Sequence, residues 1–391
     1  MASFTLYNPV RLRFGRGESE RFAEEIPQGS RVLIVYGQGS VVRSGLLDRI
    51  QQQLAGRVAW CGTFGGVQPN PEYSQLIEAL PIIAQEGVDF LLAVGGGSVV
   101  DGTKFIAAAA RYTGAEPWEF LTKPGLVQDA IPMGAVMTLP ATGSEMNHLS
   151  VVSRSELGVK LGFGSSHVYP RFSVVDPVLT ETLPQRQVAN GVVDAFVHVL
   201  EQYLVAGGGA PIHDRFAEGI LSTLVEVGEA TVEDPTNAPA RDAMCYAATM
   251  ALNGLIGAGL PQDWSTHQIG HELTALWGID HARSLAAIMF DNFELRFSSK
   301  QERIAQYGRR VWGLAGSDES VARAALEKTR SFFEALGVPT SLGAYEGIGE
   351  NPGARVVANL AITRPGKCYG EDRSVTPEMV QEIVDRSAAR A

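Results

Sequence analysis

The chain has 391 residues, 45% of them hydrophobic and 19% charged, which is typical of a compact globular protein with two domains. Its net charge is −11 and it has no Lys/Arg cluster, so neither nucleic acid nor an anionic membrane is an expected partner. Three widely spaced cysteines, Cys61, Cys245 and Cys368, argue for a reducing compartment and against a disulfide framework. The N-terminus lacks the apolar core of a signal peptide, and no apolar run approaches ~18 residues. We therefore expect a cytoplasmic protein.

Up to about residue 185, short apolar runs alternate with stretches of helical periodicity. The predicted strands are residues 31–36, 57–61, 88–94, 135–139 and 172–176, and the predicted helices are residues 46–54, 76–87 and 102–112. Fully apolar runs of this length suit parallel strands that are buried on both faces. The alternation of strands and helices predicts an open, doubly wound α/β sheet.

Two glycine-rich turns follow predicted strands of this region. The first is Gly37, Gln38, Gly39 and Ser40, and the second is Gly95, Gly96, Gly97 and Ser98. Free backbone N–H groups and the helix dipole at such positions favour an anion. Neither turn completes GxGxxG, because Val42 and Val100 stand in place of the third glycine, and each alone is also consistent with a plain turn. Two of them on one sheet favour a bound dinucleotide. A third stretch, residues 138–145, adds three hydroxyl groups that suit pyrophosphate or nicotinamide.

The charges near these turns bear on which dinucleotide binds. Folds that prefer NAD usually place an acidic side chain against the ribose 2′-hydroxyl. Here neither the first turn nor residues 61–66, the expected exit of the second strand, contain Asp or Glu, and Arg43 lies shortly beyond Ser40. A 2′-phosphate would meet a cation and no repulsion, so we expect NADP(H).

Beyond residue 185 strand signals nearly vanish. The predicted helices are residues 187–204, 215–230, 241–256, 264–278, 282–297, 301–316 and 320–337. The domain junction is expected within residues 176–187, which gives an α/β dinucleotide-binding domain, residues 1–185, and an all-helical metal-binding domain, residues 186–391.

The first helix of this half carries four polar residues at i, i+4 spacing, namely Asn190, Asp194, His198 and Gln202. Their neighbours are almost all apolar, which is typical of a buried helix, and a buried Asp and His need a partner such as a shared metal ion. From this helix alone, a stripe that faces solvent on an amphipathic helix is the favoured alternative.

A second segment supplies more histidines. His267 and His271 share one face of the helix predicted over 264–278, and His281 follows at the start of the next helix. The order of residues does not match HExxH, and spacing does not choose between His271 and His281 as a ligand. One Asp and several His match the ligand sets of Zn²⁺ or Fe²⁺.

These motifs resemble those of the iron-containing (group III) alcohol dehydrogenases, and more narrowly the branch of NADPH-dependent butanol dehydrogenases and broad-range aldehyde reductases. The resemblance rests on LLAVGGGSVVDGTKFIAAAA, TLPATGSE, RQVANGVVDAFVHVLEQY, LNGLIGAG and DWSTHQIGHELTALWGIDHARSLA, and it extends through about residue 345. It implies a Rossmann-like N-terminal domain and an all-α C-terminal domain, an architecture shared with dehydroquinate synthase, and it implies a homodimer.

The resemblance also assigns individual site residues. It places one divalent metal ion on Asp194, His198, His267 and His281, with His271 and Asp101 as catalytic residues. It places NADP(H) on Gly37, Gln38, Gly39, Ser40, Gly95, Gly96, Gly97, Ser98, Asp101, Thr138, Thr142, Ser144, Asn147, Lys160 and Leu179. Gln38 departs from the family pattern, because close relatives have a smaller residue there.

The implied reaction is hydride transfer between NADP(H) and a small aldehyde or primary alcohol, with the metal polarising the carbonyl and His271 relaying a proton. One alternative is an NAD-dependent polyol dehydrogenase of the glycerol type, which the missing ribose-binding acid disfavours. Another is a lyase of the dehydroquinate synthase type, which should need a Lys/Arg cluster, although Arg283 is the one such residue in the metal segment. A non-catalytic binding protein is a third alternative.

Overall fold

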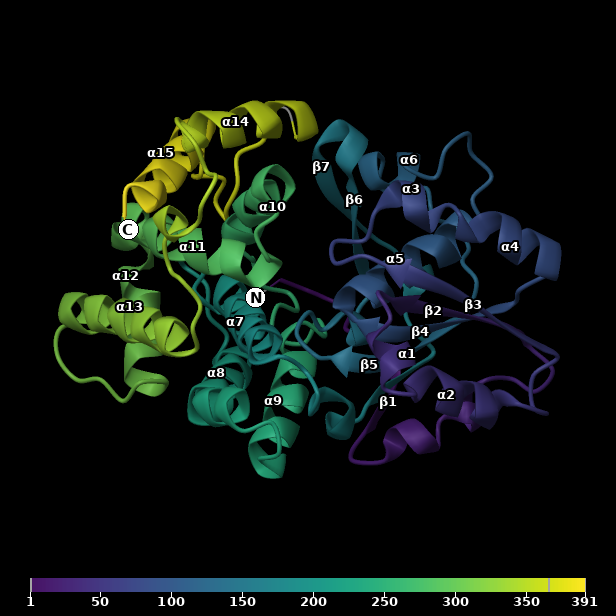
Figure 1. Ribbon diagram of the computed structural model, residues 1–391. Helices are drawn as coiled ribbons and strands as arrows, with labels where there is room; N and C mark the ends of the chain where they lie inside the picture. Colours follow the sequence, from purple (N-terminus) through teal and green to yellow (C-terminus); the bar gives the residue numbers. More distant parts are fainter. Residues whose placement is uncertain (1, 365, 391) are drawn as a thin grey trace. The chain divides into compact units, whose positions relative to one another are not determined.

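The computed structural model of the protein describes residues 2–364 and 366–390. The chain divides into two compact units (Figure 1). One unit is Tyr7–Leu183, and the other begins at Pro184 and includes the N-terminal segment that ends at Leu6. Within the second unit, the N–H of Ala2 donates to the carbonyl of Gly259 at 2.9 Å. None of the helices in the described part of the chain is both long and apolar enough to cross a membrane.

The first unit is built on a six-stranded parallel sheet with the order β1-β8-β5-β4-β2-β3. Its strands are β1 (Arg11–Phe14), β2 (Arg31–Gly37), β3 (Trp60–Val67), β4 (Phe90–Gly96), β5 (Met133–Leu139) and β8 (Phe172–Val175), and β6 (Leu149–Arg154) and β7 (Val159–Gly164) form a separate antiparallel hairpin. Its α-helices are α1 (Ser40–Arg43), α2 (Leu46–Leu54), α3 (Tyr73–Leu76), α4 (Ala79–Glu86), α5 (Gly97–Ala109) and α6 (Glu119–Thr122). The predicted doubly wound α/β class is therefore confirmed.

Both faces of the sheet are buried, as the apolar runs predict. In β2, Val32 and Ile34 pack in one cluster with Leu46 and Ile50 of α2. Because successive side chains of a strand point to opposite faces, the intervening Leu33 lies on the other face, where it is also fully buried. Figure 1 shows α1 and α2 on one side of the sheet and α3, α4 and α5 on the other.

The second predicted strand is displaced. Residues 57–61 were expected to form it, but β3 begins at Trp60, which pairs with Arg31 at the start of β2. The glycines of β3 interrupt the apolar run that would otherwise mark this strand in the sequence. A Cβ on Gly62 would lie 2.1 Å from the Trp60 ring, and one on Gly65 would lie 2.3 Å from Tyr36, so these glycines make room for aromatic rings.

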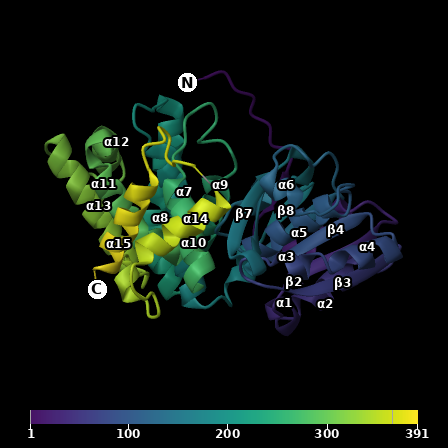
Figure 2. The ribbon, with the colours of Figure 1, turned by 90° about the horizontal axis from the view of Figure 1, so that it is seen from above.

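The second unit is all-helical, and no strand occurs among its described residues. Its α-helices are α7 (Gln185–Tyr203), α8 (Pro211–Glu233), α9 (Ala238–Ala251), α10 (Ser265–Trp277), α11 (His281–Leu295), α12 (Phe297–Arg310), α13 (Asp318–Ala335), α14 (Pro352–Thr363) and α15 (Pro377–Ala388). Helix α7 packs against α8, α9 and α11 (Figure 2). It is buried from Val188 to Tyr203, so its polar residues lie inside the unit.

Several helical predictions differ from the structure: the helix expected over 76–87 is divided between α3 and α4, and the one expected over 301–316 ends at Arg310. The helix expected over 241–256 ends at Ala251, and the chain then turns through Gly254 at a φ of 90°, a conformation that favours glycine. The C-terminal tail, for which no elements were predicted, forms α14 and α15. Both helices contribute apolar residues to a core shared with α10 and α11, including Val356 and Ile383.

Candidate functional site

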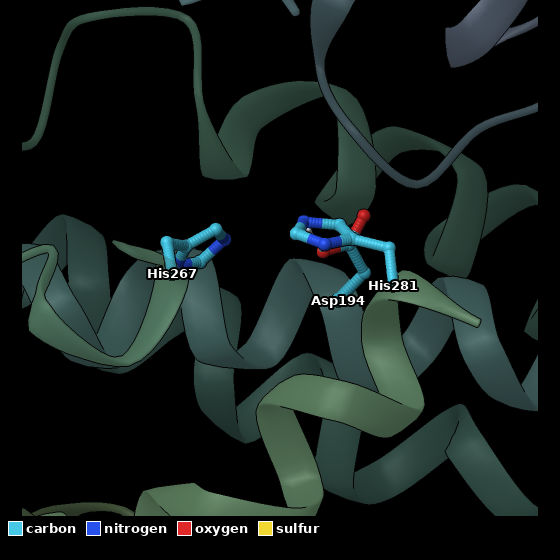
Figure 3. Close-up of side chains that lie close together, drawn as sticks. All are labelled: Asp194, His267 and His281. Carbon is cyan, nitrogen blue, oxygen red and sulfur yellow. Dashed lines mark ion pairs between the residues drawn. The ribbon is translucent and has the colours of Figure 1, made fainter. Parts of the chain in front are cut away.

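Three helices bring Asp194, His267 and His281 together. Asp194 is in the middle of α7, His267 is in the first turn of α10 and His281 begins α11. One potential ligand atom from each lies within 4.8 Å of the others, and the three side chains gather in one place (Figure 3). Asp194 and His267 are buried, and His281 is half-buried. A buried carboxylate with two imidazoles is a donor set that fits Zn²⁺ or Fe²⁺.

His198 lies beside this set. Its Nδ1 is 3.8 Å from Asp194 Oδ1, and its ring stacks on that of His267 with centroids 4.6 Å apart. Burial, together with nearby His267, holds the pKa of His198 well below its usual 6.5. The ring is therefore neutral, which is the form of histidine that binds metals. His198 is nevertheless not among the three residues whose ligand atoms all lie within 4.8 Å of one another.

His271 lies next to the cluster. Its ring centroid is 5.2 Å from that of His281 and 6.5 Å from that of His267, and its side chain is buried. Asp194, His267 and His281, whose ligand atoms lie within 4.8 Å of one another, are called the close group below. This group contains His281 and not His271, although spacing in the sequence did not choose between the two. His148 belongs to the α/β unit, where its ring packs at a tilt against Tyr169 with centroids 5.1 Å apart.

The remaining members of the polar stripe on α7 hold neighbouring segments. Asn190 donates to Asp280, the residue before His281, at 2.9 Å, and Gln202 donates to the carbonyl of Ala251 at 2.9 Å. All four residues of the stripe are buried. The alternative of a stripe that faces solvent is therefore excluded.

Sequence reasoning missed Glu201, which contacts a member of the close group. It is 1% exposed, and it accepts hydrogen bonds from the backbone N–H of Thr266 at 2.6 Å and of His267 at 3.1 Å. Nδ1 of His267 also lies in close hydrogen-bond contact with its Oε2. Burial and nearby Asp263 raise the pKa of Glu201, and these N–H donors oppose that shift. Its position three residues after His198, on the same helix face, was the available signal.

In the α/β unit, the predicted turns lie at the carboxyl edge of the sheet. β2 ends at Gly37, β4 at Gly96 and β5 at Leu139, and the three strands are neighbours in the order β5-β4-β2. From β2 the chain passes to β3 on one side, and from β3 it returns to β4 on the other side of β2. The turns after β2 and β4 therefore flank the point where the winding reverses, which is where open α/β sheets bind their ligands.

The second and third turns interlock. A Cβ on Gly97, the first residue of α5, would lie 2.2 Å from Thr142 Oγ1, and one on Gly95 would lie 2.4 Å from Val99. Glycine is thus required there for packing within the unit. Thr142 Oγ1 also accepts the N–H of Ser144 at 3.2 Å.

A buried lysine, also missed in the sequence, joins α5 to the hydroxyl-rich turn. Lys104 Nζ donates to Ser144 Oγ at 2.8 Å and to Asn147 Oδ1 at 3.0 Å, and Ser144 Oγ in turn donates to Asp101 at 2.5 Å. Burial lowers the pKa of Lys104 to about 8, against the attraction of Asp101 and Glu145. Burial raises the pKa of Asp101, against the attraction of Lys104. The structure thus brings Asp101, Ser144 and Asn147 into one network.

The other predicted cofactor residues occupy the surroundings of these turns. Lys160 of β7 donates to Asn70 Oδ1 at 2.8 Å, and the N–H of Asn70 donates to Ser98 Oγ at 3.3 Å, so Lys160 is linked to the second turn. Thr138 is near the end of β5, and Leu179 is in the 3₁₀ turn Pro177–Thr180 after β8, packed against the sheet core.

The first turn is the most open of the three. Gln38 and Ser40 are exposed, and Gly39 has a φ of 97°. A Cβ on Gly39 would lie 3.5 Å from Arg43 Nη1, so the guanidinium lies beside the turn. Residues 61–66 are inside β3 and were wrongly expected at its exit, but residues 68–70, which follow β3, also contain no acid.

Known proteins match both units. Residues 9–177 match the family model for iron-containing alcohol dehydrogenase, and residues 188–388 match the C-terminal model of the Fe-containing alcohol dehydrogenase family. The chain belongs to the iron-containing alcohol dehydrogenases. As a member of this family it is an oxidoreductase that transfers hydride between alcohols and aldehydes, and the resemblance inferred from its motifs is confirmed.

Its relatives in the family include enzymes named for either nicotinamide cofactor. The chain is 52% identical over 348 residues to the NADPH-dependent aldehyde reductase YqhD of Escherichia coli K12, covering 88% of this chain and 89% of that protein. It is 41% identical over 392 residues to the probable NADH-dependent butanol dehydrogenase 1 of Bacillus subtilis 168, covering 99% and 100%. The crystal structure of E. coli K-12 YqhD superposes with a TM-score of 0.95 at 48% identity, covering 99% of both chains.

The Lys104 network predicts a stability effect in this alcohol dehydrogenase. Lys104→Met removes a buried cation that attracts the buried Asp101 and Glu145, and it should lower the free energy of unfolding by about 3–5 kcal/mol. Thermal and urea unfolding of the full chain measure this loss. Lys123→Met, at an exposed i, i+4 pair with Glu119, is the control and should change stability by less than about 0.5 kcal/mol. Equal stability of the two variants would contradict the assigned role of Lys104.

Proposed function

We propose that the chain is a metal-dependent, NADP(H)-dependent enzyme that interconverts small aldehydes and primary alcohols. The observation that carries the proposal is the convergence of Asp194, His267 and His281, from three helices, within 4.8 Å in a chain of this family. The aldehyde reductase name of a relative at 52% identity supports the substrate class. The family resemblance further supports a cytoplasmic homodimer.

The metal part of the proposal assigns a divalent ion, Zn²⁺ or Fe²⁺, to Asp194, His267 and His281, with His198 as the fourth ligand. The neutral state that burial imposes on His198 supports this assignment. When bound, the ion supplies Lewis acidity toward a carbonyl oxygen, and the nicotinamide supplies the hydride. The chain contributes donors that are mostly buried, which would shield an ion held there from solvent.

The dinucleotide part of the proposal assigns the phosphates to the two glycine turns, residues 37–40 and 95–98, and to the hydroxyl groups of Thr138, Thr142 and Ser144. Their place at the reversal of the sheet winding supports this assignment. Lys160 and Leu179 are assigned to the nicotinamide end. Both carboxylate oxygens of Asp101 accept hydrogen bonds, from Ser144 Oγ and from the N–H of Val151. These bonds favour a role for Asp101 in ordering the turn, although a catalytic role stays a prediction.

The first experiment is an initial-rate assay of NADPH oxidation with butanal, with NADH in parallel, on enzyme of known metal content. We expect faster turnover with NADPH, loss of turnover on chelation, and recovery on addition of zinc or iron, because both groups take part in the reaction. A clear preference for NADH would overturn the cofactor assignment. No turnover with either cofactor, in metal-replete enzyme, would overturn the aldehyde reductase function.

Arg43 provides a test of the cofactor preference. Because its guanidinium lies beside Gly39, Arg43→Ala should raise KM for NADPH about 10-fold, equivalent to about 1.4 kcal/mol, and leave KM for NADH unchanged. Arg49→Ala is a matched control, since Arg49 is a nearby exposed arginine that contacts Glu20 and the Ser44 carbonyl. An equal rise for both cofactors in Arg43→Ala would mean that Arg43 does not recognise a 2′-phosphate.

His271 provides a test of the proton relay. It is buried beside His281 and outside the close group, so His271→Ala should lower kcat about 100-fold while metal content stays at the wild-type level. Elemental analysis of the purified variant measures the metal. Loss of metal from His271→Ala would instead make His271 a ligand, and unchanged kcat would exclude the relay.

A further inference from the structure

Glu201 is a buried carboxylate that meets the first turn of α10 from another helix. Its two oxygens receive the backbone N–H of Thr266 and of His267, and Nδ1 of the His267 ring contacts Oε2 as well. One carboxylate thus binds both the backbone and the side chain of a proposed metal ligand.

The start of α10 needs such a partner. Its N-cap residue, Trp264, has a φ of 61° and provides no side-chain hydrogen bond to the helix. The first N–H groups of a helix otherwise require a cap, and a carboxylate there also interacts favourably with the helix dipole. Glu201 supplies this cap from another helix, because α7 places its side chain at the N-terminal end of α10.

The segment before α10 is anchored on the same helix. The N–H of Asp263 donates to the carbonyl of Glu201 at 2.9 Å, and Asp263 Oδ2 is paired with Arg296 at 2.6 Å and with Lys300 at 2.8 Å. Asp263 Oδ1 accepts the N–H of Ser265 at 3.1 Å. These buried contacts leave the chain little freedom between residue 263 and the first turn of α10.

The contact with Glu201 also distinguishes the two ring nitrogens of His267. Both oxygens of Glu201 already accept backbone N–H groups, so the side chain acts as an acceptor toward His267. A neutral His267 ring then carries its proton on Nδ1 and its lone pair on Nε2, on the side of the ring away from Glu201. Carboxylates that bind the second nitrogen of a metal-ligating histidine fix its tautomer and orientation in this way.

We infer that Glu201 is a positioning residue, which holds His267 in the tautomer and orientation that present Nε2 to the proposed divalent ion. The inference rests on the proposed function, because it requires a metal on His267. It adds an assignment that the motifs did not make: the glutamate three residues after His198 controls a ligand on a different helix.

Glu201→Gln separates capping from control of the tautomer. The amide keeps one oxygen for the N–H of Thr266, but its NH₂ group opposes both the N–H and the Nδ1 proton of His267. The affinity of metal-stripped protein for Zn²⁺, measured by competition with a chromogenic chelator, should fall about 10- to 100-fold. The visible absorption spectrum of the Co²⁺-loaded protein should change as well. Glu201→Asp keeps an acceptor and should recover part of the affinity.

Glu218→Gln is the matched control. Glu218 is also buried in the helical unit, and it accepts hydrogen bonds from Tyr203 at 2.7 Å and from Arg310 at 2.7 Å, away from the histidines. This variant should keep the wild-type affinity for Zn²⁺ and the wild-type Co²⁺ spectrum. Metal-free unfolding curves of both variants show how much stability each change removes.

The outcomes separate this inference from the proposed function. Wild-type affinity and an unchanged Co²⁺ spectrum in Glu201→Gln would overturn the role of Glu201 and leave the metal site standing. Failure of the wild-type protein to bind Zn²⁺ or Co²⁺ would overturn both. If Glu201→Gln does not fold, ¹⁵N NMR of histidine-labelled, metal-free wild-type protein, assigned with His267→Gln, decides. A proton on Nδ1 of His267 supports the role, and a proton on Nε2 overturns it.

Discussion

Helix α7 is buried along nearly its whole length, and this burial constrains the rest of the helical unit. A polar group inside a protein costs free energy unless it is paired, so each polar residue of α7 has to find a partner on a neighbouring segment. Asn190 binds the residue before α11, Gln202 binds the end of α9, and Glu201 binds the start of α10. These pairings fix the ends of the helices that carry His267 and His281. The placement of the histidines around Asp194 thus follows from the pairing of polar groups within a core.

The α/β unit meets a similar constraint by different means. Its turns lie at one edge of a sheet that is covered on both faces, so the chain must leave the strands through glycines that allow close packing, as at Gly97 against Thr142. Lys104, in the helix α5 that follows the second turn, then donates hydrogen bonds to Ser144 and Asn147 and so links α5 to the third turn. The second and third turns are thus linked to each other before any ligand arrives, which reduces the ordering that a dinucleotide would have to impose there.

Patterns that are local along the chain predicted the fold class and marked Asp194 and His267 as candidate ligands. The choice of His281 over His271 came from the family resemblance, because spacing left it open. Apolar runs marked four of the sheet strands, and i, i+4 spacing marked Asp194. The sequence reasoning placed β3 wrongly, because Gly62 and Gly65 make room for rings that belong to other positions. The sequence reasoning also missed Lys104 and Glu201, and one physical reason accounts for both residues. Their partners are distant in sequence, and a buried charge is recognised only when the groups around it are known.

The three residues of the close group come from helices that are far apart in the sequence, and no short peptide of this chain contains all of them. An unfolded chain therefore offers no preformed chelate, whereas the folded helical unit does. An ion that binds only the folded form shifts the folding equilibrium by mass action, by about 2.7 kcal/mol at a free concentration 100 times its dissociation constant. The lifetime of this enzyme in a cell would then follow the supply of metal, and starvation for the ion would remove folded protein as well as activity.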